Sequence, residues 1–260
     1  MTGTMWLGIL IPFFGTTLGA GFVFLLKDHI KPWINTVLAG FASGVMMAAS
    51  VWSLLIPAIE MSDSMGKFSF LPAAVGFAAG IVFLLCMDKV VPHIHIESGQ
   101  QEGMKAKLTK TTMLIFAVAL HNLPEGMAVG IVFAGLRTGM SEVTLAGAMA
   151  LAFGIALQNI PEGAIISLPL KGEGMSKPKA FFYATLSGVV EPIGALIMIS
   201  LTSIMKPILP YTLAFAAGAM VYVIIEELVP ESATSGHSDK GTLGFMAGFI
   251  IMMILDVALG

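Results

Sequence analysis

His-Asn-Leu-Pro-Glu-Gly at residues 121–126 lies in the middle of an apolar stretch, and a near copy, Gln-Asn-Ile-Pro-Glu-Gly at residues 158–163, lies in the next one. Each copy places a charged glutamate among residues that otherwise suit lipid. A carboxylate at bilayer depth is costly and is retained where it has a function. The two motifs therefore indicate a polar site inside a membrane.

The composition is that of a polytopic membrane protein. Of 260 residues, 57% are hydrophobic and only 11% are charged, whereas a soluble domain is about 25% charged. The net charge of -3 says little about partners, but the sequence lacks a basic cluster of the kind that a nucleic-acid binder needs. The single Cys86 excludes an intrachain disulfide and a cysteine-based zinc site.

Eight segments are apolar over the length that a membrane-spanning helix needs, roughly 20 residues. They lie near residues 4–26, 34–60, 70–90, 111–136, 142–169, 179–204, 209–231 and 241–259. We expect an all-α membrane protein whose whole chain, 1–260, forms one transmembrane domain. The one long connection, 91–110, is polar and is expected to be a cytoplasmic loop.

The distribution of basic residues predicts the orientation. Of the 13 lysines and arginines, only Lys67, Arg137 and Lys206 lie in the second, fourth and sixth loops. The positive-inside rule then places the odd-numbered loops in the cytoplasm and both termini outside. We expect an integral protein of a bacterial-type inner membrane.

A faint repeat links the second and seventh segments. Leu-Ala-Gly-Phe-Ala-Ser-Gly (38–44) opens the second and Leu-Ile-Pro-Ala-Ile-Glu (55–60) closes it; Leu-Ala-Phe-Ala-Ala-Gly (213–218) opens the seventh and Leu-Val-Pro-Glu (228–231) closes it. The two segments run in opposite directions, as in the inverted repeats of many secondary transporters. Chance similarity between two Ala/Gly-rich helices is the alternative.

The intramembrane polar residues favour a divalent-metal site. Residues four apart share a helix face, so His121 points with Glu125, and Gln158 points with Glu162. The two helices run in opposite directions and carry the motifs at similar depth, and Glu191 adds a carboxylate from the sixth segment. Imidazole and carboxylate oxygens suit zinc and other first-row divalent ions. The alternative is that these groups only hold helices together, as Asn and Gln often do.

Both motifs resemble the signatures of the ZIP (Zrt/Irt-like) family, transporters of zinc and related divalent metals. Residues 52–60 and 88–95 resemble its GufA-like branch, and the resemblance covers essentially the whole chain. It implies a binuclear centre in mid-membrane, a three-two-three arrangement of helices (3+2+3) with inverted repeats, and a homodimer.

The resemblance also implies the metal ligands. Those of the first site would be His121, Glu125, Gln158 and Glu162. Those of the second would be Asn122, Glu125, Asn159, Glu162 and Glu191. Glu125 and Glu162 would then bridge the two ions.

Further polar residues lie near the two ends of the spans. Candidates for the outer entrance are Glu60 and Asp63. Candidates for the inner exit are Glu226, Glu227, Glu231 and His237. The loop residues His93, His95 and Glu97 are candidates for a cytoplasmic metal site. In each case the alternative is a solvated helix end or a loop without a bound metal.

Together these features predict transport of divalent metal into the cytoplasm, with release assisted by protonation of Glu125 or Glu162 and with the fourth and fifth helices moving against the rest. Zinc is the expected cargo, with Cd2+, Fe2+ and Mn2+ as alternatives, and no other cofactor is expected. An intramembrane zinc-dependent hydrolase is disfavoured because the protease signature HExxH is absent. A metal sensor without net flux is the other alternative.

Overall fold

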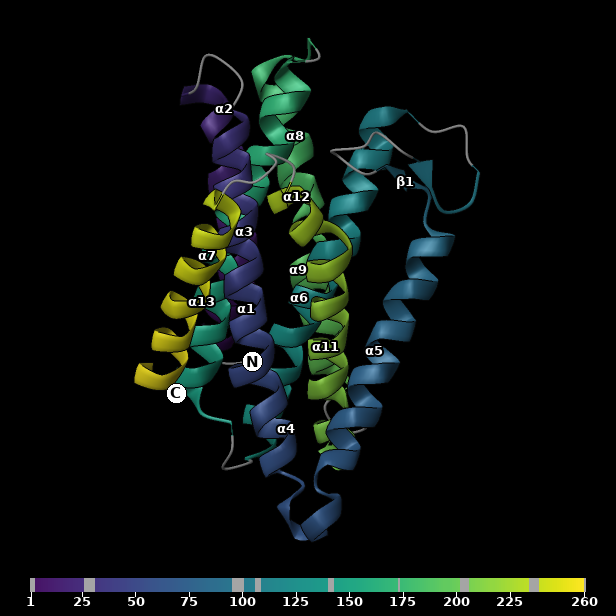
Figure 1. Ribbon diagram of the computed structural model, residues 1–260, viewed down its shortest axis with the longest axis vertical. Coiled ribbons are helices and arrows are strands. Elements are labelled where there is room, and N and C mark those ends of the chain that lie inside the picture. The colour runs from purple at the N-terminus through teal and green to yellow at the C-terminus, as the bar shows by residue number, and fades with distance from the viewer. Residues whose placement is uncertain are drawn as a thin grey trace.

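A computed structural model describes residues 3–25, 31–94, 101–105, 109–139, 143–172, 174–201, 206–233 and 239–259. This part of the chain is almost wholly helical (Figure 1). Eight helical segments in it are long and apolar enough to cross a membrane: Gly3–Leu25, Pro32–Glu60, Phe70–Val90, Thr111–Thr138, Leu145–Gly172, Lys177–Ser200, Leu209–Ala233 and Lys240–Leu259. The predicted all-α fold with eight spans is confirmed.

Several spans consist of more than one helical element. In chain order the elements are α1 (Gly3–Ala20), α2 (Phe22–Leu25), α3 (Pro32–Ala49), η1 (Ser50–Leu55), α4 (Ile56–Glu60), η2 (Asp63–Phe68), α5 (Phe70–Val90), β1 (His93–Ile94), β2 (Gln101–Glu102), α6 (Lys110–Thr138), α7 (Leu145–Gly172), α8 (Lys177–Ser187), α9 (Val190–Ser200), η3 (Lys206–Ile208), α11 (Leu209–Val223), η4 (Ile224–Leu228), α12 (Val229–Ala233) and α13 (Lys240–Leu259). The first, second, sixth and seventh spans are the interrupted ones.

The sixth span is interrupted beside its glutamate. α8 ends at Ser187, and α9 begins at Val190 after a short turn. Pro192 has no N–H to donate to the carbonyl of Gly188, and it lies in the first turn of α9, where an N–H group would have no partner within the helix. Glu191 therefore lies in the first turn of α9.

The helices pack in four close pairs: α3 with α13, α5 with α11, α1 with α7, and α6 with α9. A glycine permits the approach in every pair. A Cβ added at Gly44, Gly80, Gly15 or Gly126 would collide with backbone atoms of the facing helix. Small residues commonly line helix interfaces in membranes, where lipid supplies no hydrophobic drive for helices to associate.

Two structural features agree with the inverted repeat between the second and seventh spans. Both spans contain a π-helical segment, η1 and η4, and in both a proline is the second residue after it: Pro57 and Pro230. The helix pairs also match. An inverted repeat relates the first, second and third spans to the sixth, seventh and eighth, and the fourth span to the fifth. It converts the pair α3–α13 into α11–α5 and the pair α1–α7 into α9–α6, which are the pairs observed. The three-two-three arrangement itself remains a prediction.

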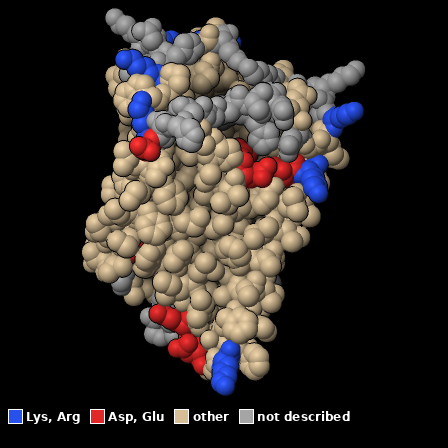
Figure 2. Space-filling view, viewed as in Figure 1, with Lys and Arg blue, Asp and Glu red and all other residues tan. Residues whose placement is uncertain are grey.

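The surface is that of a membrane protein. Figure 2 shows charged side chains toward the two ends of the molecule and a wide uncharged band between them. Large apolar side chains such as Leu18, Phe182 and Ile254 are more than half exposed on the outside of the helices. The chain is thus an integral membrane protein.

The connection between α5 and α6 contains a short antiparallel ladder within its described part. β1 pairs with β2, and His93 lies opposite Glu102. α6 then begins after Thr109, whose side chain accepts a hydrogen bond from the backbone N–H of Thr112, and it ends at Thr138, before Gly139, which has a φ of 72°. Residues 95–100 and 106–108 of the predicted loop lie outside the described residues.

Candidate metal centre

The two repeated motifs lie on α6 and α7 and face each other inside the protein. Asn122, Glu125, Gln158 and Asn159 are fully buried. The Gln158 side-chain amide donates a hydrogen bond to Oε1 of Glu125, with 2.5 Å between the heavy atoms. Because Pro124 and Pro161 lie within continuous helices, both motifs keep the helical spacing that aligns their polar side chains.

Six polar side chains of this region each hold one buried oxygen for which the described residues supply no hydrogen-bond partner. These oxygens are Asn122 Oδ1, Glu125 Oε2, Gln158 Oε1, Asn159 Oδ1, Glu162 Oε2 and Glu191 Oε2. One buried polar atom without a partner costs roughly 1–3 kcal/mol, so a group of six calls for a ligand. Carboxylate and amide oxygens in such a group suit a divalent cation.

Three of these side chains, Glu191, Asn122 and Asn159, are also held by hydrogen bonds from or to neighbouring helices. Oε1 of Glu191 accepts a hydrogen bond of 2.8 Å from the hydroxyl of Thr16 on α1. The Asn122 amide donates to the carbonyl of Ser187 at 3.4 Å, and the Asn159 amide donates to the carbonyl of Pro12 at 3.5 Å. Such partners orient side chains that bind metal.

The three glutamates of the centre come from three different helices. Glu125, on α6, is close enough to Glu162 on α7 and Glu191 on α9 to interact electrostatically with both. Like charges in a buried place repel each other unless a proton or a cation is shared between them. Their convergence is therefore consistent with a cation-binding role.

His121 contacts a carboxylate of the seventh span. Its Nε2 lies 2.6 Å from Oε1 of Glu227 on η4, although the ring is also within electrostatic range of Glu162. No group of three or more His, Cys, Asp and Glu side chains in the described ranges is arranged to hold a metal.

Comparison with known proteins identifies the family. The profile described as ZIP Zinc transporter matches residues 95–256. The chain belongs to the ZIP family of zinc transporters. Its family relatives include zinc transporter ZIP11 of Xenopus tropicalis, which is 37% identical over 98% of this chain and 96% of that protein.

Two bacterial relatives extend this comparison within the ZIP family. Zinc transporter ZIPB of Bordetella bronchiseptica is 36% identical over 95% of this chain and 79% of that protein. Zinc transporter GufA of Myxococcus xanthus is 37% identical over 95% of this chain and 96% of that protein. The resemblance to the GufA-like branch is confirmed, and the family and these relatives are transporters, not enzymes.

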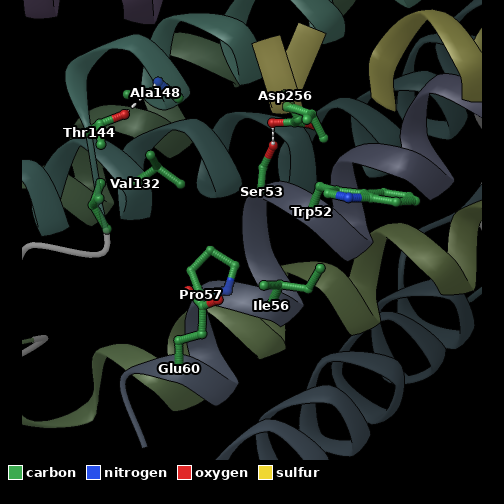
Figure 3. A pocket seen from close by; sticks show the side chains of 12 residues that line it. Trp52, Ser53, Ile56, Pro57, Glu60, Val132, Thr144, Ala148 and Asp256 are labelled. Atoms are coloured by element: carbon green, nitrogen blue, oxygen red, sulfur yellow. Dashed lines mark hydrogen bonds between the residues drawn. The ribbon is translucent and has the colours of Figure 1, made fainter. Parts of the chain in front are cut away.

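At one end of this ZIP protein a cavity of about 250 Å³ lies between the second, fourth, fifth and eighth spans. Trp52, Ser53, Glu60 and Asp256 are among its lining residues (Figure 3). Glu60 is exposed at the end of α4, and Asp63 is exposed at the start of η2 without lining the cavity. Of the two predicted entrance residues, only Glu60 therefore borders a cavity.

Asp256, on α13, is a cavity residue that sequence reasoning missed. It is only 9% exposed, and the hydroxyl of Ser53 donates a hydrogen bond to its Oδ1 at 2.6 Å (Figure 3). Its Oδ2 finds no hydrogen-bond partner among the described residues. The available signal was a lone carboxylate in an otherwise apolar final span.

At the opposite end, the predicted exit residues differ in their surroundings. Glu226 is exposed, whereas Glu227 and Glu231 are half-buried. Both half-buried carboxylates are close enough to His121 to interact with it electrostatically. His237 lies outside the described residues. Glu226, although exposed, lines a small cavity together with His121 and Glu227.

The loop residue His93 belongs to a buried network. Its Nδ1 lies 2.8 Å from the carbonyl oxygen of Val91, and its Nε2 lies 3.1 Å from Oδ1 of Asp88. The hydroxyl of Tyr222, on α11, donates to Oδ2 of Asp88 at 3.2 Å. The network ties β1 to α5 and α11. The other two loop candidates, His95 and Glu97, lie outside the described residues.

Proposed function

We propose that this protein transports zinc and related divalent cations across a membrane into the cytoplasm. The observation that carries the proposal is the group of six buried oxygens without partners, which lies on the two repeated motifs and on Glu191. Membership of the ZIP family and the names of its zinc-transporting relatives support the same cargo.

The proposed centre is binuclear. In the first site the ligands are His121, Glu125, Gln158 and Glu162. In the second they are Asn122, Glu125, Asn159, Glu162 and Glu191, so that Glu125 and Glu162 bridge. The buried oxygens of the six carboxylate and amide residues support this assignment. A donor set of one imidazole with carboxylates and amides also suits Cd2+, Fe2+ and Mn2+.

The proposed path runs from the cavity at Glu60 and Asp256 to the centre and then past His121 and Glu227. The short distance between His121 Nε2 and Glu227 Oε1 supports transfer of the cation toward Glu227 and Glu231. The excess of basic residues in odd-numbered loops supports a cytoplasmic exit, with both termini outside a bacterial-type inner membrane. A homodimer is proposed from the family resemblance alone.

The close helix contacts at two glycines limit which helices can move independently during transport. Gly15 brings α1 against α7, and Gly126 brings α6 against α9. If the fourth and fifth spans moved alone, as expected from the sequence, α7 would separate from α1 and α6 would separate from α9. We therefore propose that the first and sixth spans move together with them.

The test is zinc and cadmium flux into liposomes that contain the purified protein. Wild type should show saturable flux, and Glu125→Ala and Glu162→Ala should abolish it. Asp239→Ala is a matched control, because Asp239 is an exposed carboxylate that belongs to neither the centre nor the proposed path. Metal binding without flux in wild type would refute transport and favour a sensor, and metal-dependent hydrolysis without flux would favour an enzyme.

A further inference from the structure

The hydroxyl of Thr16 bonds differently from most helical hydroxyls in this protein. Serine and threonine in a helix commonly donate to the carbonyl four residues earlier. Thr17 donates in this way to Phe13 at 2.9 Å, and Ser43 donates to Ala39 at 2.8 Å. Thr16 instead donates to Oε1 of Glu191, which is 175 positions away in the chain.

Thr16 is held tightly at this position. Its side chain is fully buried, and Glu191 is 1% exposed. A Cβ at Gly188 would lie 3.0 Å from Cβ of Thr16 and 3.1 Å from Oε1 of Glu191, so the turn between α8 and α9 lies directly against both. On the other side, a Cβ at Gly163 would collide with the carbonyl oxygen of Thr16. Thr16 thus lies between the second motif and Glu191.

The bond leaves Glu191 with one satisfied oxygen and one available oxygen. Oε1 accepts from Thr16, while Oε2 is buried without a hydrogen-bond partner in the described part of the chain. α1 also reaches Asn159, whose amide donates to the carbonyl of Pro12. The same helix therefore restrains two residues of the proposed second site.

We propose that Thr16 is a positioning residue of the metal centre, whose hydroxyl orients the Glu191 carboxylate so that its other oxygen binds the second cation. This inference rests on the proposed binuclear centre. A hydrogen bond to the non-coordinating atom of a ligand fixes the direction of its donor oxygen, and loss of such a partner typically weakens metal affinity. Thr16 would thereby control occupancy of the second site without touching the metal.

The test is equilibrium binding of Cd2+ to the full-length purified protein, measured as the number of ions bound and the affinity of each binding step. Thr16→Val keeps the shape of the side chain and removes the hydroxyl. It should weaken the second step by about 10–100-fold and leave the first step unchanged. Thr16→Ser retains a hydroxyl and should restore the second step.

The matched control is Thr17→Val, because among the described residues the Thr17 hydroxyl bonds to a backbone carbonyl of its own helix and to no residue of the proposed centre. It should bind both ions as wild type does. Equal loss in Thr16→Val and Thr17→Val, or failure of Thr16→Ser to restore the second step, would show a purely structural role and overturn the inference. Thr16→Val that binds two ions with wild-type affinities would also overturn it.

Failure of the proposed centre gives a separate result. Wild type that binds no Cd2+ would refute the metal centre itself, and the inference about Thr16 would fall with it. Wild type that binds one ion, with the same affinity in Thr16→Val, would refute the second site while leaving the first.

Discussion

Replacing Glu227 with glutamine should tighten metal binding at His121 and slow release of the metal. In the structure Nε2 of His121 lies 2.6 Å from Oε1 of Glu227. We expect the cation to bind through the same nitrogen, the one farther from the α6 backbone. Metal and Glu227 then compete for one atom, so a weaker competitor leaves the metal more firmly bound.

The size of the effect follows from the kind of contact that is lost. A hydrogen bond to a charged group contributes about 1.5–3 kcal/mol, whereas a neutral one contributes about 0.5–1.5 kcal/mol. Glutamine keeps a neutral acceptor near His121, so the competition weakens by about 1–1.5 kcal/mol, which is about tenfold in the dissociation constant.

The assay is competition for Zn2+ between the purified protein and a chelating dye, combined with flux into liposomes at saturating zinc. Glu227→Gln should bind zinc about tenfold more tightly than wild type and show slower maximal flux. Glu226→Gln is the matched control, because Glu226 is the exposed neighbour on the same π-helical segment and should leave both quantities unchanged.

Weaker zinc binding in Glu227→Gln would refute this reasoning. It would mean that the metal uses Nδ1 while Glu227 supports the ring through Nε2, as carboxylates do for many metal-binding histidines. An effect of equal size in Glu226→Gln would indicate a general loss of negative charge at this end rather than competition for His121.

Three further predictions concern helix packing, the cavity at Glu60 and Asp256, and the connection between α5 and α6. Gly15→Ala should lower the stability of the purified protein by about 1–3 kcal/mol, seen as a lower thermal unfolding temperature, because the new Cβ collides with the backbone of α7. The control is Gly3→Ala, whose Cβ meets no atom within 4 Å and which should leave the unfolding temperature unchanged. Asp256→Asn should raise the zinc concentration for half-maximal flux without changing the maximum, because it removes a carboxylate that concentrates cations in the cavity at Glu60; an unchanged concentration dependence would contradict that role. Tyr222→Phe removes the hydrogen bond to Asp88, a contribution of about 0.5–3 kcal/mol, and should speed amide exchange at β1. Unaltered exchange would show that His93 holds β1 without Tyr222.

The sequence by itself determined the membrane fold and the main chemistry. Lipid cannot satisfy backbone polar groups, so a span must be a helix or a strand of a closed barrel. Eight stretches in the sequence have the length and the apolar character of spanning helices. For the same reason His121, Glu125, Glu162 and Glu191 stand out against their apolar neighbours. The helical spacing within each motif is enough to place its polar groups on one face of the helix.

Tertiary structure alone decided which groups support these residues. Thr16 is a threonine in an apolar helix, and nothing in its own surroundings in the sequence distinguishes it from Thr17. Its partner is 175 positions away, and the partner of Ser53, Asp256, is 203 positions away. Glu227 likewise reaches His121 from a distant span. The periodicity of a sequence indicates which face of a helix is polar. Which residues lie against that face depends on how the helices pack, and here glycines allow several of the helices to approach closely.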